Sequence, residues 1–576
     1  MQYRITILAA MMAFSVNSKA QSIAPNYKGL SESNPISASV FCADPTALEY
    51  NGRLYVYGTN DTQQYIKNGK KGGNGYGDIS SIVIFSTDDL VNWTFHGTID
   101  VRKLCSSWGW RFAASWAPSV TWRTTADGKE EFFLYFANSG GSVGVLKASS
   151  PIGPWSSPLS KPMIDGDTPG VKPCHWIFDP GVIIDENGTG WIGFGGGDPQ
   201  DHGTDIQPNN ARFAKLKSSM TALDGSAVKI PAPYHFEASE LNIMAGKFVY
   251  TYCSNWAERK DADWNAYKKE HNITLSKPNT CTMCYMVSAD PMNSDSWVYK
   301  GVCGPHPGFP SPNNHSHLHK FKGDYYYIYH WAPLMQKMKD AKVIDDSADG
   351  YRSLCVNKAT VNEETQTINS VTQNLKGVTA IKNLNPYVLQ QAETMSNSGG
   401  VSYEDFSNIT KNTSISTLGN DASRNLQVKM AAGAWTQVRS VDFGTQGAAS
   451  FTIRAKGTGT VELRFYPKGK TIATLDFSST DFEDHTIAVD PTQFTGIQTN
   501  IYIVFTAATN VQFDAWQFTE AQTEGITPVE GVPSTEVQLY DLSGRRLAKN
   551  RPQQGIVIKQ YTDANGVKRS RKVTAY

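Results

Sequence analysis

Three acidic residues, Asp44, Asp179 and Glu237, occupy equivalent places in a recurring pattern of this 576-residue chain. Each begins a strand-like segment, and a turn glycine follows it by 8, 9 and 9 residues, respectively. If such strands start at one end of a common ring, the three carboxylates meet there although they are far apart in sequence. Like charges and partial burial separate the pKa values of neighbouring carboxylates, so one can donate a proton while another accepts one. The pattern therefore predicts acid–base chemistry.

The same pattern of a strand start, a turn glycine and an aromatic-rich strand occurs five times. The strand starts are Asp44, Trp116, Asp179, Glu237 and His315, and the glycines are Gly52, Gly128, Gly188, Gly246 and Gly323. Asn-Gly and similar pairs supply the positive φ angles that tight hairpin turns need, so each unit is expected to contain a hairpin. Further strand-like segments follow in each interval. Five repeats of about four strands predict a five-bladed β-propeller.

The composition fits an all-β protein. The chain has 14 Trp, 26 Tyr and 25 Phe together with 48 Gly and 28 Pro, which favours short strands joined by tight turns. Lys and Arg number 53, and so do Asp and Glu, so there is no basic surplus for binding nucleic acid. The 40% hydrophobic content excludes global disorder.

The N-terminus has the features of a secretory signal. A short basic start precedes an apolar run from Ile5 to Val16, which is too brief to span a bilayer, and Ala20 is the expected cleavage position. No later stretch has the apolar length of a membrane helix, so a secreted or outer-surface protein is expected. Eight cysteines in an exported chain permit disulfides, but their spacing leaves the pairing open.

The strand starts also carry a family resemblance. The segments 42–52, 116–120, 178–185, 236–242 and 314–315 resemble glycoside hydrolase family 43, over roughly residues 35 to 375. The resemblance implies an inverting hydrolase that acts on xylan- or arabinan-type sugars. It assigns Asp44 as the general base, Glu237 as the general acid, and Asp179 as the carboxylate that orients the acid and tunes its pKa. Inversion requires the base and the acid to stand about 6.5–9.5 Å apart, with a water beside the base.

Glu240 competes with Glu237 for the role of acid, because it lies only three residues further along. In an extended strand the two side chains face opposite sides, so only one of them can enter the site. The sequence Phe236-Glu237-Ala-Ser favours Glu237.

Three further residues are candidates for the same site. Trp116 is expected to form an apolar wall for a sugar ring, with a core role as the alternative. Arg352 is expected to reach sugar hydroxyls or to form a buried pair with a carboxylate. His315 resembles an axial histidine that helps to hold calcium or ordered water, and His317 would point the same way in a strand.

Beyond residue 386 the sequence resembles a family 6 carbohydrate-binding module with a β-sandwich (jelly-roll) fold. By that resemblance Gln391, Glu393 and Asp514 bind a structural calcium, and Trp435 stacks against sugar. The second tryptophan of the usual stacking pair is missing, so a purely structural module is the alternative. Residues 534–576 resemble a C-terminal sorting domain of Bacteroidetes secretion, with a small β appendage as the alternative.

The expected organisation is a signal peptide (1–20), a propeller hydrolase domain (30–375), a β-sandwich module (386–521) and a C-terminal unit (534–576). The expected function is that of a secreted α-L-arabinofuranosidase on arabinoxylan. A β-xylosidase or xylanase of the same family, or a noncatalytic xylan-binding surface protein, would also fit. No organic cofactor is expected. Structural calcium is expected in the channel of the propeller and in the β-sandwich module. The expected partner is plant cell-wall polysaccharide, and the protein is expected to be a monomer.

Overall fold

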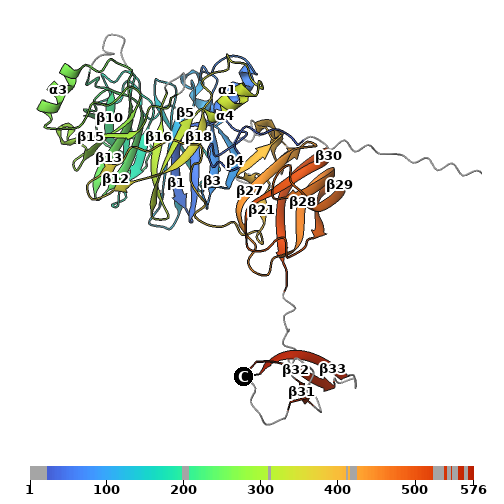
Figure 1. Cartoon of the computed structure of the whole chain (residues 1–576). Coiled ribbons are helices and arrows are strands. Elements are labelled where there is room, and N and C mark those ends of the chain that lie inside the picture. Colours follow the sequence, from blue (N-terminus) through green and yellow to red (C-terminus); the bar gives the residue numbers. More distant parts are fainter. Residues whose placement is uncertain are drawn as a thin grey trace, which may run out of the picture.

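The computed structural model describes residues 23–197, 206–308, 313–409, 413–414, 425–522, 537–540, 546–547, 555–562 and 568–575. The expected signal peptide at 1–20 lies outside these residues, and so do residues 523–536, between the expected β-sandwich module and most of the C-terminal unit. The described chain is almost entirely β (Figure 1). The few helices are α1 (Asp61–Asn68), α2 (Val101–Leu104), η1 (Ser106–Arg111), α3 (Asp261–Glu270), η2 (Ser294–Ser296), α4 (Pro333–Asp340) and η3 (Tyr403–Asp405).

Five antiparallel sheets follow one another along the first part of the chain. The first holds β1 (Ala43–Tyr50), β2 (Arg53–Thr59), β3 (Ser81–Thr87) and β4 (Trp93–Asp100); the second holds β5 (Trp116–Thr124), β6 (Glu130–Ala137) and β7 (Val143–Ala148). The third holds β8 (Gly181–Ile184), β9 (Gly190–Phe194), β10 (Ala211–Lys215) and β11 (Val228–Ile230). The fourth holds β12 (His235–Met244), β13 (Lys247–Ser254), β14 (Met283–Ser288) and β15 (Val298–Gly304); the fifth holds β16 (Ser316–Phe321), β17 (Asp324–Trp331) and β18 (Ser353–Ala359). A short pair, β19 (Val361–Asn362) and β20 (Thr367–Ile368), comes next.

The hairpins predicted from the turn glycines are confirmed. All five of these glycines have positive φ, between 73° and 90°. In the β1–β2 turn, Asn51 and Gly52 have φ values of 49° and 73° and connect the paired residues Tyr50 and Arg53. This conformation twists in the same sense as the flanking strands, which explains the Asn-Gly sequence.

The first strands of the five sheets lie against one another in chain order. β1 contacts β5, β5 contacts β8, β8 contacts β12, β12 contacts β16, and β16 contacts β1. A separate apolar cluster fills each space between neighbouring sheets; Leu134 lies in the one between the first and second sheets, and Val145 in the next. Because every sheet is buried on both faces, its strands are apolar along most of their length. The starts of the first strands therefore come together.

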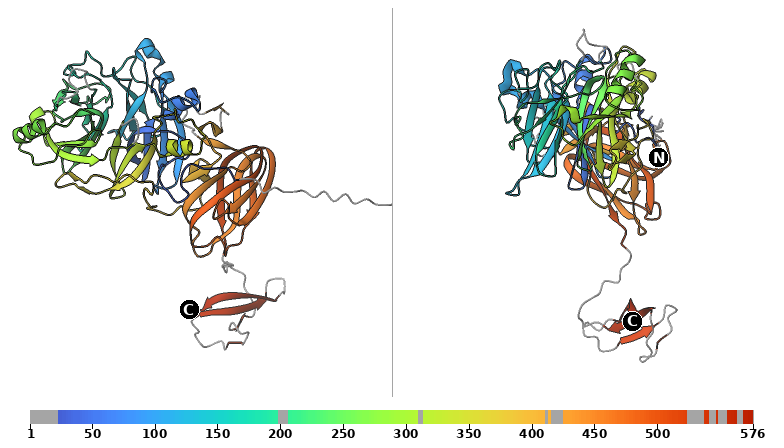
Figure 2. Two further views of the ribbon diagram at one scale, coloured as in Figure 1. Left: turned by 45° about the horizontal axis from the view of Figure 1, so that its top comes forward. Right: turned by 90° about the vertical axis from the view of Figure 1, so that its left-hand side faces the viewer.

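A nine-stranded sheet follows in the C-terminal part of the chain. It contains β21 (Gln390–Gln391), β23 (Asn397–Gly399), β24 (Phe406–Asn408), β25 (Thr413–Ser414), β26 (Leu426–Met430), β27 (Trp435–Asp442), β28 (Ala448–Arg464), β29 (Thr471–Ala488) and β30 (Ile497–Glu520). It adjoins the first sheet, because β22 (Thr394–Met395) pairs with the outer strand β4 (Figures 1 and 2). One apolar cluster continues across the junction, where Phe95 packs against Phe406.

The N-terminal segment crosses this junction. The Nζ of the buried Lys28 donates to Ser396 O at 2.6 Å, and the backbone N–H of Asn34 donates to Leu375 O at 3.1 Å.

At the other end of the chain, β31 (Val537–Tyr540), β32 (Gly555–Thr562) and β33 (Lys568–Ala575) form a small sheet. Among the described residues, we find no helix with the length and apolar character that crossing a membrane requires.

Candidate active site

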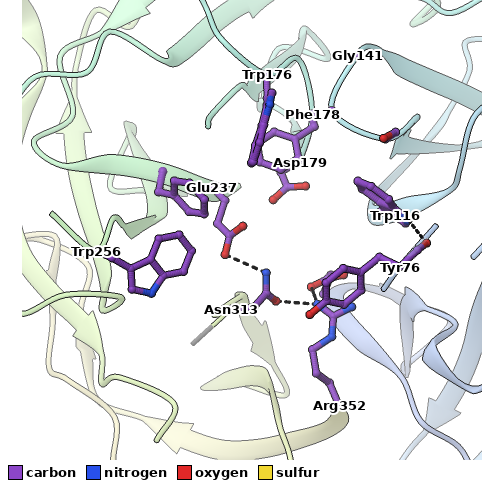
Figure 3. A pocket seen from close by; sticks show the side chains of 14 residues that line it. Tyr76, Trp116, Gly141, Trp176, Phe178, Asp179, Glu237, Trp256, Asn313 and Arg352 are labelled. Atoms are coloured by element: carbon purple, nitrogen blue, oxygen red, sulfur yellow. Dashed lines mark hydrogen bonds and ion pairs between the residues drawn. The ribbon is translucent and has the colours of Figure 1, made fainter. Parts of the chain in front are cut away.

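A pocket of about 560 Å³ opens where the first strands begin, and it brings all three predicted carboxylates together (Figure 3). Most of its wall is aromatic, while the polar groups gather at its base. The lining residues are Asp44, Tyr76, Trp116, Ser139, Gly140, Gly141, Trp176, Phe178, Asp179, Phe236, Glu237, Trp256, Asn313 and Arg352. An apolar enclosure with a few convergent charged groups is typical of a small-molecule site.

The backbone at the strand starts is strained in a repeated way. Asp44, Ala117 and Asp179 each precede a proline and have φ values of 49°, 38° and 46°. Ala238, directly after Glu237, has a φ of 64°. Non-glycine residues adopt this conformation at a cost of about 1–3 kcal/mol and do so mostly at functional sites. The kink at each start turns the carboxylates of Asp44 and Asp179 toward the pocket.

Asp44 is held in its ionised form. Its Oδ1 accepts a hydrogen bond from Arg352 Nη1 at 2.8 Å, and its Oδ2 accepts one from Thr59 Oγ1 at 2.7 Å. Burial alone would raise the pKa of Asp44, but the Arg352 guanidinium and the nearby His330 outweigh it and keep this pKa well below the ordinary value. An ionised carboxylate at this position can accept a proton.

Glu237 has the opposite tendency. Burial and the adjacent Asp179 raise the pKa of Glu237 well above its ordinary value. Burial and Asp44 likewise raise the pKa of Asp179, to about 8, although its Oδ2 accepts a hydrogen bond from the backbone of Ala238 at 2.9 Å. Two buried carboxyl groups side by side cannot both ionise readily, so the pair retains a proton. The pocket thus combines a proton acceptor with a proton donor.

Two of the residues predicted to bind substrate, Trp116 and Arg352, line this pocket. Trp116 lines the wall and donates its indole N–H to Tyr76 O at 3.1 Å, which fixes the ring. Arg352 lines the pocket, and it is also a buried partner of carboxylates, which was the alternative role predicted for it. Its Nε and Nη2 donate to the two oxygens of Asp61 at 2.9 and 2.8 Å, which leaves Nη1 directed at Asp44.

Several lining residues escaped prediction because no repeated motif marks them. Asn313 donates from Nδ2 to Glu237 Oε1 at 3.0 Å and accepts at Oδ1 from Arg352 Nη1 at 2.7 Å. It directly precedes the Asn314-His315 motif, which was the only signal near it. The side chains of Trp176 and Trp256 are 38% and 42% exposed, which is unusual for tryptophan. Their exposure depends on how the surrounding loops fold, which the sequence does not show.

The expectation that Glu237 and Glu240 face opposite sides is wrong. A register shift between these residues interrupts the regular alternation of β12, so both side chains turn inward. Glu240 is fully buried, 3.5 Å from Ser119 Oγ on β5 and 3.3 Å from His317 Nδ1 on β16. Only Glu237 lines the pocket.

His315 lies behind the pocket floor. Its Nδ1 is 3.7 Å from Asp44 Oδ1 and 3.9 Å from Asp179 Oδ2, so the imidazole stands between the two carboxylates. Burial lowers the pKa of His315 to about 3, so the ring is neutral. Within the described part of the chain, no group of three or more His, Cys, Asp and Glu side chains is placed to hold a metal ion.

The predicted sugar-stacking role of Trp435 does not agree with its burial. This side chain is 1% exposed, packs against Tyr502 and donates its indole N–H to Ala24 O at 3.0 Å. Ile23 and Leu30 from the N-terminal segment pack against the same cluster. A ring covered in this way offers no face to a sugar.

The three other residues predicted to bind metal lie close together where β21 pairs with β30 and the chain leaves β21. Gln391 pairs with Ala515, and Ala392 donates its backbone N–H to Asp514 O at 2.9 Å. Glu393 is buried, and burial together with Asp514 raises its pKa well above the ordinary value. Asp514 also forms an ion pair with Arg454 at 3.2 Å.

Comparisons with known proteins agree with this geometry. Residues 33–331 match the family model described as Glycosyl hydrolases family 43, and residues 391–520 match Carbohydrate binding module (family 6). An arabinoxylan arabinofuranohydrolase of Bacillus subtilis (strain 168) is 36% identical over 86% of this chain and 93% of the relative. A protein of the same name from Paenibacillus polymyxa is 35% identical over 84% of this chain and 74% of the relative. A crystal structure of a family 43 arabinoxylan arabinofuranohydrolase from Bacillus subtilis in complex with cellotetraose superimposes with a TM-score of 0.74 at 35% identity, and covers 87% of this chain and 99% of that one.

Proposed function

The chain belongs to glycosyl hydrolase family 43, and we propose that it removes α-L-arabinofuranosyl groups from arabinoxylan by a single inverting displacement. One observation carries the proposal. An ionised Asp44 and a protonated Glu237 line the same pocket, and their pKa values are shifted in opposite directions. Glycoside hydrolysis by a pair of carboxyl groups requires this division of protonation, and the family resemblance implies the inverting course.

In the proposed mechanism, a water molecule lies beside Asp44 and attacks the anomeric carbon of the sugar. Asp44 accepts the proton of this water while Glu237 donates its proton to the departing glycosidic oxygen. Asp179 helps to keep the proton on Glu237 until that moment, since two adjacent buried carboxyl groups cannot both ionise without a cost. Arg352 holds Asp44 in place, and its two bonds to Asp61 fix the guanidinium.

The choice of sugar rests on the relatives, whose names specify arabinoxylan and arabinofuranosyl groups. Product analysis on wheat-type arabinoxylan tests it. We expect free arabinose with an intact xylan backbone. Free xylose would indicate a β-xylosidase, and short oligomers a xylanase; either outcome would overturn the proposed specificity.

Trp256 is placed to contact the group that leaves. It lies on the Glu237 side of the pocket, with its ring 4.3 Å from that of Phe236, and it remains 42% exposed (Figure 3). Because the acid must face the leaving oxygen, the departing xylan unit stacks on this side. We expect Trp256→Ala to raise KM for arabinoxylan oligosaccharides about 5- to 15-fold, the loss of roughly 1–1.5 kcal/mol of stacking. KM for arabinofuranosyl fluoride, whose leaving group has no ring to stack on Trp256, serves as the internal control; an equal rise for both substrates would contradict this placement.

The pH dependence follows from the two shifted carboxyl groups. The reaction needs Asp44 without a proton and Glu237 with one. Because the pKa of Asp44 is lowered, activity should persist below pH about 4, where ordinary carboxylates gain their protons. Because the pKa of Glu237 is raised, activity should fall only on the alkaline side, as Glu237 ionises. A kcat profile that is half-lost near pH 4 and lacks an alkaline limb would show that these assignments are wrong.

We also propose that the five sheets form a five-bladed β-propeller over residues 30–375. The successive contacts of their first strands support this arrangement, and so do the apolar clusters between neighbouring sheets. The proposal extends to a β-sandwich at 386–521 and a separate C-terminal unit at 534–576. A crystal structure with another number of blades would contradict it.

Export by a signal at 1–20 predicts a mature protein that begins at Gln21, which N-terminal sequencing checks.

Calcium is proposed for the C-terminal module. Gln391 Oε1 and Glu393 Oε2 are buried and make no hydrogen bond within the described residues, and Asp514 lies beside them. Buried oxygen atoms without donors suit a hard cation. Calorimetric titration of the chelator-treated protein with calcium should show binding that Glu393→Gln weakens; the absence of binding would refute the site.

A further inference from the structure

Asn313 connects the acid side of the pocket with the base side. It lies three residues before the start of β16 and stands between Glu237 and Arg352 (Figure 3). Its two side-chain hydrogen bonds form a chain that runs from Glu237 through Asn313 and Arg352 to Asp44. Its backbone oxygen is 2.9 Å from Nε2 of His330, whose Nδ1 accepts the backbone N–H of Asp44 at 3.1 Å. Asn313 is therefore tied to Asp44 by two routes.

The chemistry of Arg352 fixes which way the Asn313 amide points. A guanidinium has only hydrogen-bond donors, so the atom of Asn313 that faces it must be the oxygen. The NH₂ group then faces Glu237, and it can only donate. Oε1 of Glu237 accepts this bond. Because the carbonyl oxygen of a carboxyl group is a stronger acceptor than its hydroxyl oxygen, the bond favours Oε1 as the oxygen without the proton.

We propose that Asn313 is a positioning residue that places the acidic proton on Oε2 of Glu237. Within the described residues, the hydrogen bond from Asn313 goes to Oε1 and none goes to Oε2, so Oε2 of Glu237 is available to the leaving oxygen. The inference rests on the proposed function, because it concerns where the proton stands before it is transferred. A direct sugar contact by Asn313 is the main competing explanation, and the leaving-group test below separates the two.

The test compares leaving groups in Asn313→Ala and Asn313→Asp. Arabinoxylan has a poor leaving group that needs the acid, whereas a dinitrophenyl arabinofuranoside departs without protonation. We expect kcat on arabinoxylan to fall about 10- to 100-fold, less than the roughly 10²- to 10⁴-fold loss from removing an acid, because the acid is misplaced and not removed. We expect kcat on the activated substrate to change less than about 3-fold. Asp keeps the size and the Arg352 contact but cannot donate, so Asn313→Asp should not restore activity.

The pH profile provides a second measurement. The groups that face Glu237 are Asp179, Asp44, Cys281, Arg352 and Asn313. A donor favours the ionised form of a carboxyl, so its removal should move the alkaline limb of kcat to higher pH. A purely structural role would leave this limb in place.

Asn92→Ala is the matched control. Asn92 is also a buried amide, and its Nδ2 donates to Asp89 Oδ2 at 2.6 Å and to Arg439 O at 2.9 Å, away from the pocket. It should alter the melting temperature without changing the ratio of the two substrates or the pH profile. Equal losses on both substrates in the Asn313 variants, or rescue by Asp, would overturn the inference. A wild-type protein that releases no arabinose would instead refute the proposed function.

Discussion

Asp44→Asn should lower kcat on arabinoxylan and on aryl arabinofuranosides alike, by about 10²- to 10⁴-fold. Asparagine has the same shape as aspartate but cannot accept a proton from water, and every substrate needs the attacking water to be activated. Arg352 keeps its two bonds to Asp61 in this variant, so the fold should be retained. Steady-state kinetics on both substrates, with a melting curve, measure the effect.

The control for this variant is Asp127→Asn. Asp127 is an exposed carboxylate in the turn between β5 and β6 and has no contact with the pocket. It should retain wild-type rates. If Asp44→Asn kept more than about a tenth of the activity, Asp44 would not be the base, because base catalysis is worth at least about 10²-fold.

Glu237→Gln should produce a loss that depends on the leaving group. On arabinoxylan, kcat should fall by about 10²- to 10⁴-fold, because the glycosidic oxygen departs unprotonated. A dinitrophenyl substrate should lose much less, and the alkaline limb of the pH profile should disappear together with the group that titrates there. Kinetics across a series of aryl leaving groups give the dependence directly.

Glu240→Gln tests which of Glu237 and Glu240 is the acid. Glu240 is buried against His317 and does not line the pocket, so its substitution should change stability more than rate. A leaving-group dependence in Glu240→Gln and none in Glu237→Gln would reverse the assignment of the acid.

The sequence was sufficient where function follows from the repeat. The positions of Asp44, Asp179 and Glu237 relative to the turn glycines placed them in one pocket, because the same hairpin geometry recurs in each sheet. Asp-Pro at two of the starts marks a kinked backbone. The turn glycines and the Asp-Pro pairs act on the backbone of their own hairpins, so the sequence alone is enough to predict their effect.

The remaining features depend on contacts between distant segments. Trp435 is covered by residues 23–30, more than 400 positions earlier in the chain, so its own surroundings in sequence could not reveal its burial. The inward turn of Glu240 results from a bulge that strand periodicity does not predict. Asn313 acquires its place through Glu237, which lies on β12 of the fourth sheet, and through Arg352, which lies 39 residues further along the chain, just before β18.

The shared core between the first sheet and the nine-stranded sheet also has a functional implication. β22 extends the first sheet, and Lys28 and Asn34 attach the N-terminal segment to both parts. The first sheet contributes Asp44 to the pocket, so the C-terminal module supports the framework that carries the base.

The stereochemistry of the first product tests the central claim most directly. Proton NMR can follow arabinose released from α-linked arabinoxylan before the anomers equilibrate. Direct attack by water that Asp44 activates, opposite the bond that Glu237 protonates, predicts β-arabinose as the first signal. An initial α-anomer would mean that the sugar first became bonded to the protein, and it would contradict the account of this pocket.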